Sequence, residues 1–175
     1  MLWTILIIIA VVIAGILIFA ATKPDVFRVQ RSATIAAPAD KIFPHLLDFQ
    51  RWPSWSPYEK KDPDMKRTFS GPATGPGATY AWEGDKNIGT GRIEVTEVAP
   101  NVRLAFDLIM LKPFHARNKG EFTLEPQGNG TRVTWAMHGP APFFSKLMQV
   151  FCNMDRMVGG DFEKGLADLK TISEK

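Results

Sequence analysis

Few side chains in this sequence have the type and spacing that metal or nucleophilic chemistry requires. The three histidines, His45, His115 and His138, lie far apart, and none pairs with the lone cysteine, Cys152, at a metal-ligand spacing. The stretch GPATGPG at 71–77 lacks the lysine and the Ser/Thr of a phosphate-binding loop, and the chain has no nucleophile elbow. We therefore expect no metal site and no cofactor.

The remaining candidates are polar side chains in apolar strand rows. Asn118 and Tyr80 each share a predicted strand face with apolar residues, and Arg31 has the apolar phase of the first strand. General acid–base catalysis needs a titratable group within hydrogen-bonding reach of the substrate, and these residues form no dyad, while Asp107 has the opposite strand phase from Phe106. Asn118 can orient a ligand or be a satisfied core amide, and Arg31 can contact a ligand or extend to solvent.

The elements that position these side chains follow from the spacing of apolar residues. Alternation predicts a first strand at 26–35, and a helix with core spacing follows at 37–49. Six further antiparallel strands are predicted at 66–71, 78–83, 89–98, 103–111, 114–125 and 131–138. From 143 to 175 apolar residues recur every three or four positions, which predicts one amphipathic helix of about eight turns. Gly159 and Gly160 in its middle indicate a bend or a close approach to the sheet.

Composition favours one ordinary globular domain. The chain has 175 residues, of which 45% are hydrophobic, and a formal net charge of +3. Basic and acidic residues interleave, as in EKKDPDMKR at 59–67, so we expect no nucleic-acid partner. A single cysteine excludes an internal disulfide but does not indicate a redox compartment.

The first residues form the strongest single signal. Residues 2–22 contain no charge in 21 positions, and a helix of that length spans roughly 31 Å, the thickness of a bilayer core. A cleaved signal peptide is the alternative, but it requires a basic start and small residues before the cut, and cleavage after Ala21 would place Phe19 at the third position. We therefore expect a membrane anchor with a short linker at 1–24 and a folded domain at 25–175.

The orientation of a single-pass protein depends on its flanking charges. Lys23, Arg28 and Arg31 follow the apolar segment, and nothing basic except the amino terminus precedes it. By the positive-inside rule this favours a cytoplasmic domain.

Three stretches carry a resemblance to a known family. They are RSATIAAPADKIFPHLLDFQRWPSWSPY at 31–58, GTGRIEVTEVAPNVRL at 89–104 and MVGGDFEKGLADLK at 157–170. In this order they resemble the SRPBCC (START-like, helix-grip) superfamily, and within it the polyketide cyclase/dehydrase and lipid-transport branch, over residues 26–173. The resemblance implies an α+β helix-grip fold, in which a curved seven-stranded antiparallel sheet wraps a long C-terminal helix with a cavity between them. Here a single transmembrane helix precedes that fold.

The resemblance also implies where a ligand would lie. In the family a WPxWxP segment lies at one end of the grip, so Trp52 and Trp55 either cover the cavity or form the core at that end. The side chains expected to contact a ligand are Trp52, Trp55, Tyr80, Trp82, Phe106, Asn118, Phe122, Trp135, Phe151 and Met154. An empty apolar cavity of about 300 Å³ would cost about 7 kcal/mol, comparable with the net stability of a domain. The interior must therefore be filled by side chains, ligand or water.

Three functions remain open at this point. The first is a membrane-anchored domain that binds or transfers a hydrophobic small molecule or lipid. The second, which the family name implies, is a polyketide cyclase or dehydratase, for which no catalytic residues are identifiable. The third is a scaffold domain that binds no ligand and contacts a membrane partner, which a large exposed apolar patch would favour.

Overall fold

A single sheet organises the domain in the computed structural model, which describes residues 1–151 and 153–175. The strands are β1 (Val26–Ile35), β2 (Lys66–Ser70), β3 (Thr79–Glu83), β4 (Thr90–Ala99), β5 (Arg103–Lys112), β6 (Ala116–Gln127) and β7 (Gly130–Pro140). Their order is β1-β7-β6-β5-β4-β3-β2, with every neighbouring pair antiparallel. All seven predicted strands are confirmed, and their ends agree within two residues.

Three short helices connect β1 to β2. They are α2 (Ala39–Leu47), the 3-10 helix η1 (Phe49–Ser54) and α3 (Pro57–Lys61). Pro38 is extended (φ −71°, ψ 155°), so α2 begins one residue later, and the side chain of Asp48 starts η1 by accepting the N–H of Gln50 at 2.9 Å. Pro44 lies inside α2, whose apolar face is nevertheless buried.

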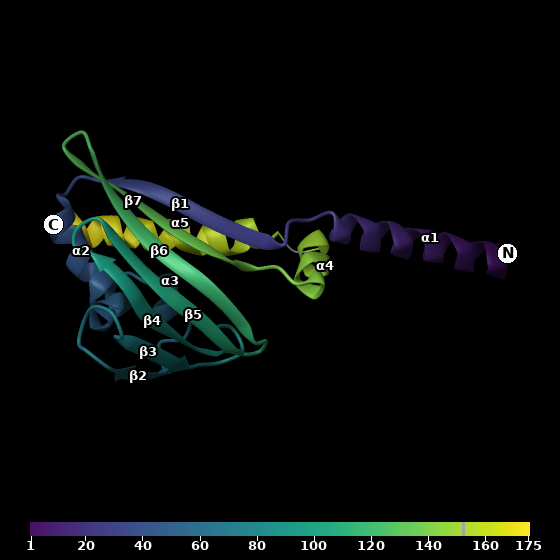
Figure 1. Cartoon of the computed structure of the whole chain (residues 1–175), viewed down its shortest axis with the longest axis horizontal. Helices are drawn as coiled ribbons and strands as arrows, with labels where there is room; N and C mark the ends of the chain where they lie inside the picture. Colours follow the sequence, from purple (N-terminus) through teal and green to yellow (C-terminus); the bar gives the residue numbers. More distant parts are fainter. Residues whose placement is uncertain (152) are drawn as a thin grey trace.

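The C-terminal segment forms two helices, so the prediction of one uninterrupted helix was wrong. These are α4 (Phe143–Phe151) and α5 (Met154–Ser173). Asn153 is extended (φ −79°, ψ 93°), and its side chain accepts the N–H of Arg156 at 3.0 Å, which caps a new helix. The helix held by the sheet is therefore α5 alone, which packs along β1 and β7 (Figure 1).

Two glycines let α5 approach its neighbours closely. A Cβ on Gly159 would lie 2.1 Å from Nη2 of Arg31, and a Cβ on Gly165 would lie 2.8 Å from the ring of Trp135. A Cβ on Gly160 would meet nothing within 4 Å. The expected close approach is thus confirmed at Gly159, and Gly160 lies in open space.

The N-terminal helix α1 (Leu2–Ala21) projects away from the domain (Figure 1). It is the one helix in the described part of the chain that is long and apolar enough to cross a membrane. Its large apolar side chains are exposed along its length, and its last turn packs against α4, where Ala20 is buried. Four residues, 22–25, join it to β1, a reach of roughly 13 Å.

Candidate functional site

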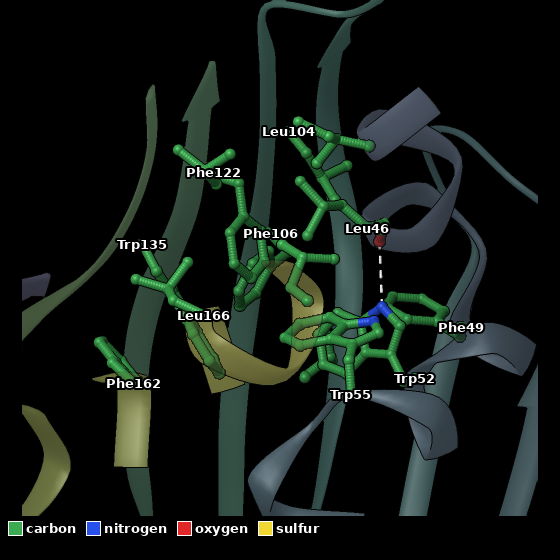
Figure 2. Packing of buried hydrophobic residues seen from close by; sticks show 14 of the residues in the cluster. Leu46, Phe49, Trp52, Trp55, Leu104, Phe106, Phe122, Trp135, Phe162 and Leu166 are labelled. Atoms are coloured by element: carbon green, nitrogen blue, oxygen red, sulfur yellow. Dashed lines mark hydrogen bonds between the residues drawn. The ribbon is translucent and has the colours of Figure 1, made fainter. Parts of the chain in front are cut away.

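The inner face of the sheet, against which α5 packs, carries a cluster of buried aromatic side chains along its middle and the part far from α1. Figure 2 shows how these rings pack on one another. The rings of Trp135 and Phe162 stack at 4.0 Å between centroids, and Phe122 lies 5.0 Å from Trp135. Phe122 and Trp55 are completely buried. This part of the interior is a packed core. Here the space is filled by side chains, one of the three possibilities that the sequence left open.

The two tryptophans of the WPSW segment belong to this core. Trp52 is 3% exposed and Trp55 is 0% exposed. Their indole N–H groups donate to the carbonyl oxygens of Leu46 at 3.0 Å, drawn in Figure 2, and of His45 at 2.9 Å. The hydrogen bonds to α2 satisfy the polar atoms that burial would otherwise strand, which explains why large aromatic residues stand beside prolines here.

Gly120 does not leave open space beside Asn118, because Phe106 occupies it. A Cβ on Gly120 would lie 2.1 Å from Cε2 of Phe106. The glycine therefore lets the ring of Phe106 lie against β6. Asn118 faces β7 instead, where its Oδ1 would lie 2.2 Å from a Cβ on Gly139.

On β3, β5 and β6 the inward side chains become more exposed toward the end of the sheet nearest α1. On β5, Leu104 and Phe106 are buried, whereas Leu108 and Met110 are only half-buried. On β3 the inward Tyr80 is buried but Trp82 is half-buried, and on β6 the inward Gly120 is buried but Asn118 is half-buried. The half-buried inward side chains, which we term the open inner face, are Phe27, Trp82, Leu108, Met110 and Asn118. This set is apolar except for one amide, which is the composition of a small-molecule site.

The predicted ligand-contact residues fall into three groups in the structure. Six of them are core side chains that pack on one another: Trp52, Trp55, Tyr80, Phe106, Phe122 and Trp135. Trp82 and Asn118 belong to the open inner face, and Met154 is half-buried at the start of α5. Phe151 is 69% exposed at the end of α4. Ligand contact by any of them stays a prediction.

Sequence reasoning missed a buried polar cluster around Glu59. This α3 side chain accepts the phenol O–H of Tyr80 at 2.5 Å and Nε of Arg67 at 2.7 Å, on separate oxygens. Burial, reinforced by the bond to Glu59, raises the pKa of Tyr80, and the bond to Glu59 raises the pKa of Arg67. Glu59 stands in the charged run 59–67, which has the pattern of a solvated surface, so nothing local marked it as buried.

Arg31 connects β1 to α5 and does not point to the open inner face. Its Nε lies 2.7 Å from Glu163 and its Nη2 lies 2.9 Å from Asp155. Hydrogen bonds to these carboxylates raise the pKa of Arg31, and the bond from Arg31 lowers the pKa of Asp155. Asp107 lies on the outer face, 4.0 Å from Nζ of Lys119.

Two surface depressions lie beside the β5–β6 hairpin and between α3 and α5. The first is lined by Arg92, Ile109, Met110, Leu111, His115, Ala116 and Arg117, beside the β5–β6 hairpin. The second lies between α3 and α5, where Lys60 and Lys61 pair with Asp168 and Asp161. Within the described part of the chain, no group of three or more His, Cys, Asp and Glu side chains could hold a metal ion.

Solved structures share this architecture at low sequence identity. Protein CV1439 from Chromobacterium violaceum is 13% identical with a TM-score of 0.60, and the match covers 87% of this chain and 99% of that protein. The di-domain ARO/CYC StfQ from the steffimycin biosynthetic pathway is 14% identical with a TM-score of 0.65, and the match covers 85% of this chain and 51% of StfQ. The chain thus spans about half the length of StfQ. At such identities the likeness establishes the fold alone.

Sequence comparison identifies the family. No curated protein matches the chain. The family model described as polyketide cyclase / dehydrase and lipid transport matches residues 26–174, which is the entire sheet with α2 to α5. This chain therefore belongs to the polyketide cyclase/dehydrase and lipid transport family.

Proposed function

We propose that this protein is a membrane-tethered domain that binds or transfers a hydrophobic small molecule or lipid on its open inner face. The observation that carries the proposal is the loss of cover along the inward apolar rows. On β3 and β5 the inward side chains Trp82, Leu108 and Met110, toward the end nearest α1, are half-buried, whereas the inward Met137 of β7 stays buried. An acyl or isoprenoid chain laid against Trp82, Leu108 and Met110 would remove their apolar surface from water.

An anchored domain would shorten the path of a hydrophobic ligand between the bilayer and the open inner face. Moving a hydrophobic molecule through water costs about 0.8 kcal/mol per exposed CH₂ group. Because only residues 22–25 separate α1 from β1, a domain anchored by α1 would hold the open inner face within a short distance of the bilayer. A ligand could then move between bilayer and protein with little exposure to water.

The buried carboxylate favours binding over catalysis. Glu59 is a buried carboxylate and therefore a candidate acid or base, but each of its two oxygens already accepts a hydrogen bond, one from Tyr80 and one from Arg67. This bonding connects α3 to β2 and β3, so the cluster has a structural role. A cyclase would need a titratable group free to reach the substrate.

A photo-crosslinking experiment tests the proposal in the full-length protein. Membranes containing the protein are loaded with a diazirine-bearing palmitic acid and irradiated, and the modified peptides are identified by mass spectrometry. Cross-links are expected on the peptides that carry Trp82, Leu108 or Met110. Leu108→Arg should reduce them about tenfold, because an apolar chain would then contact a charge.

The adjacent residue on the same strand provides a matched control. Ile109 is also half-buried but faces the outer side of β5, so Ile109→Arg should leave the inner-face cross-links unchanged. Cross-links on α1 serve as an internal reference for membrane insertion. Cross-links on α1 without any on β3 or β5 would contradict ligand binding while leaving the tether intact.

A further inference from the structure

The exposed apolar side chains of the domain gather at one end. After α1, ten large hydrophobic residues are exposed among the described residues, and eight lie on four segments near the base of α1. We term these eight the anchor-end patch: Val26, Leu111, Phe114, Phe143, Phe144, Met148, Phe151 and Met157. The other two, Phe69 and Val102, lie at the sheet edge and in the turn between β4 and β5.

Specific contacts hold the anchor-end patch beside α1. Lys146 of α4 pairs with Asp25 of the linker at 2.6 Å, and the backbone N–H of Ala141 donates to the carbonyl of Asp25 at 2.7 Å. The rings of Phe114, in the β5–β6 hairpin, and Phe144, on α4, lie 6.4 Å apart between centroids. As Figure 1 shows, α4 occupies the junction between the sheet and α1.

The chemistry of this end suits a bilayer surface. Phe144, Phe151 and Met148 are between 45% and 69% exposed, an arrangement that costs free energy in water but not at the acyl boundary of a membrane. The adjacent depression carries the basic side chains Arg92 and Arg117, which would face anionic headgroups. An amphipathic helix with nearby basic residues is the usual form of an interfacial contact.

We propose that the anchor-end patch inserts into the bilayer interface as a second membrane contact, distinct from the membrane span of α1. This inference rests on the tether proposed above, because residues 22–25 are too short to let α4 leave the surface. Insertion of α4 and of the β5–β6 hairpin would direct the open inner face toward the lipid. The membrane would then meet the domain in one orientation.

Site-directed spin labelling of the full-length protein tests this inference. In a Cys152→Ser background, single nitroxides are placed by Phe144→Cys, Met148→Cys or Phe114→Cys, with Val102→Cys as the control at the opposite end of the domain. The proteins are reconstituted in nanodiscs of phosphatidylcholine and phosphatidylglycerol. Collision rates are measured with oxygen, which concentrates in lipid, and with a water-soluble nickel chelate.

Labels on the anchor-end patch should collide mainly with oxygen, and the label at position 102 mainly with the nickel chelate. Nickel-dominated collisions at 114, 144 and 148 would overturn the inference. Shielding from both reagents with spin–spin broadening would also overturn it, because a second copy of the chain would then cover the patch. A label introduced by Ile9→Cys reports on α1 separately, so failure of the tether is distinguishable from failure of the patch.

Discussion

At the scale of single residues, the Glu59 cluster stabilises the join between α3 and the sheet. Tyr80 is 4% exposed and donates its O–H to Glu59, which also accepts from Arg67. A buried acceptor that loses its donor retains a desolvation cost, because water cannot replace the bond. The cluster should therefore be sensitive to deletion of one oxygen atom.

The first prediction concerns that oxygen. Tyr80→Phe should lower the free energy of unfolding by about 1–2 kcal/mol, since Glu59 would lose one hydrogen bond in a buried environment. Tyr58→Phe is the control, because Tyr58 is only half-buried and its hydroxyl has no hydrogen-bond partner among the described residues. Urea unfolding of the full-length protein in detergent, followed by tryptophan fluorescence, measures both changes. Equal effects of the two substitutions would contradict the assigned role of Glu59.

At the scale of elements, α5 is fitted to the sheet by its glycines. Gly165 lies against Trp135 and Pro57, whose ring Cδ would be 2.9 Å from an added Cβ. Both neighbours are rigid, and Trp135 is stacked on Phe162, so neither can move away easily. Gly160, on the same helix, has no such neighbour.

These two glycines should respond to alanine in opposite ways. Gly160→Ala should raise the free energy of unfolding by up to about 1 kcal/mol through helix propensity alone. Gly165→Ala should be less stable than Gly160→Ala by about 1–3 kcal/mol, because the added methyl overpacks the contact with Trp135. Urea midpoints of the two variants, compared at the same detergent concentration, measure the difference. Equal stabilisation by both would show that α5 does not pack as closely as described.

The division between α4 and α5 separates two roles. Both segments have apolar residues at helical spacing, but α5 buries its apolar side chains under the sheet, whereas α4 leaves Phe143, Phe144 and Phe151 exposed. The cap at Asn153 makes this possible, because it ends one helix direction and begins another. One amphipathic pattern therefore supplies both a core helix and a helix with exposed apolar side chains.

At the scale of the whole molecule, the proposed ligand and membrane contacts both lie at the end nearest α1. The packed aromatic core occupies the far half of the domain, and the open inner face and the anchor-end patch both occupy the near half. The packed aromatic rings therefore lie away from α1. The near half is left with apolar side chains that a lipid or a ligand can cover.

The tether makes a prediction about sidedness. Lys23, Arg28 and Arg31 follow α1, so by the positive-inside rule the domain should lie in the cytoplasm. If α1 spans the bilayer, the protein should also remain in the membrane pellet after an alkaline carbonate wash. In a Cys152→Ser background, Val102→Cys places a thiol at a position that is 57% exposed. A membrane-impermeant maleimide should label it only after cell lysis. Labelling in intact cells would place the domain outside, and release by carbonate would contradict the tether.

The sequence alone determined the seven strands, the apolar N-terminal helix and the family. Strand alternation has a period of two, and the charge-free segment has the length of a bilayer core, so both are properties of adjacent residues that survive without tertiary contacts. The family stretches are likewise contiguous. The ten ligand-contact residues stay a prediction, and the sequence did not reveal that six of them pack on one another in the core.

Only the tertiary structure decided which apolar side chains are covered. The cluster of Glu59, the connection from Arg31 to Asp155 and the filling of the space at Gly120 join residues far apart in the chain. The helix break at Asn153 leaves the apolar periodicity intact on both sides, so the pattern could not reveal it. A side chain is buried when residues from another segment pack against it. A periodic pattern shows which face of a helix or strand is apolar, but it does not show which other segment packs on that face.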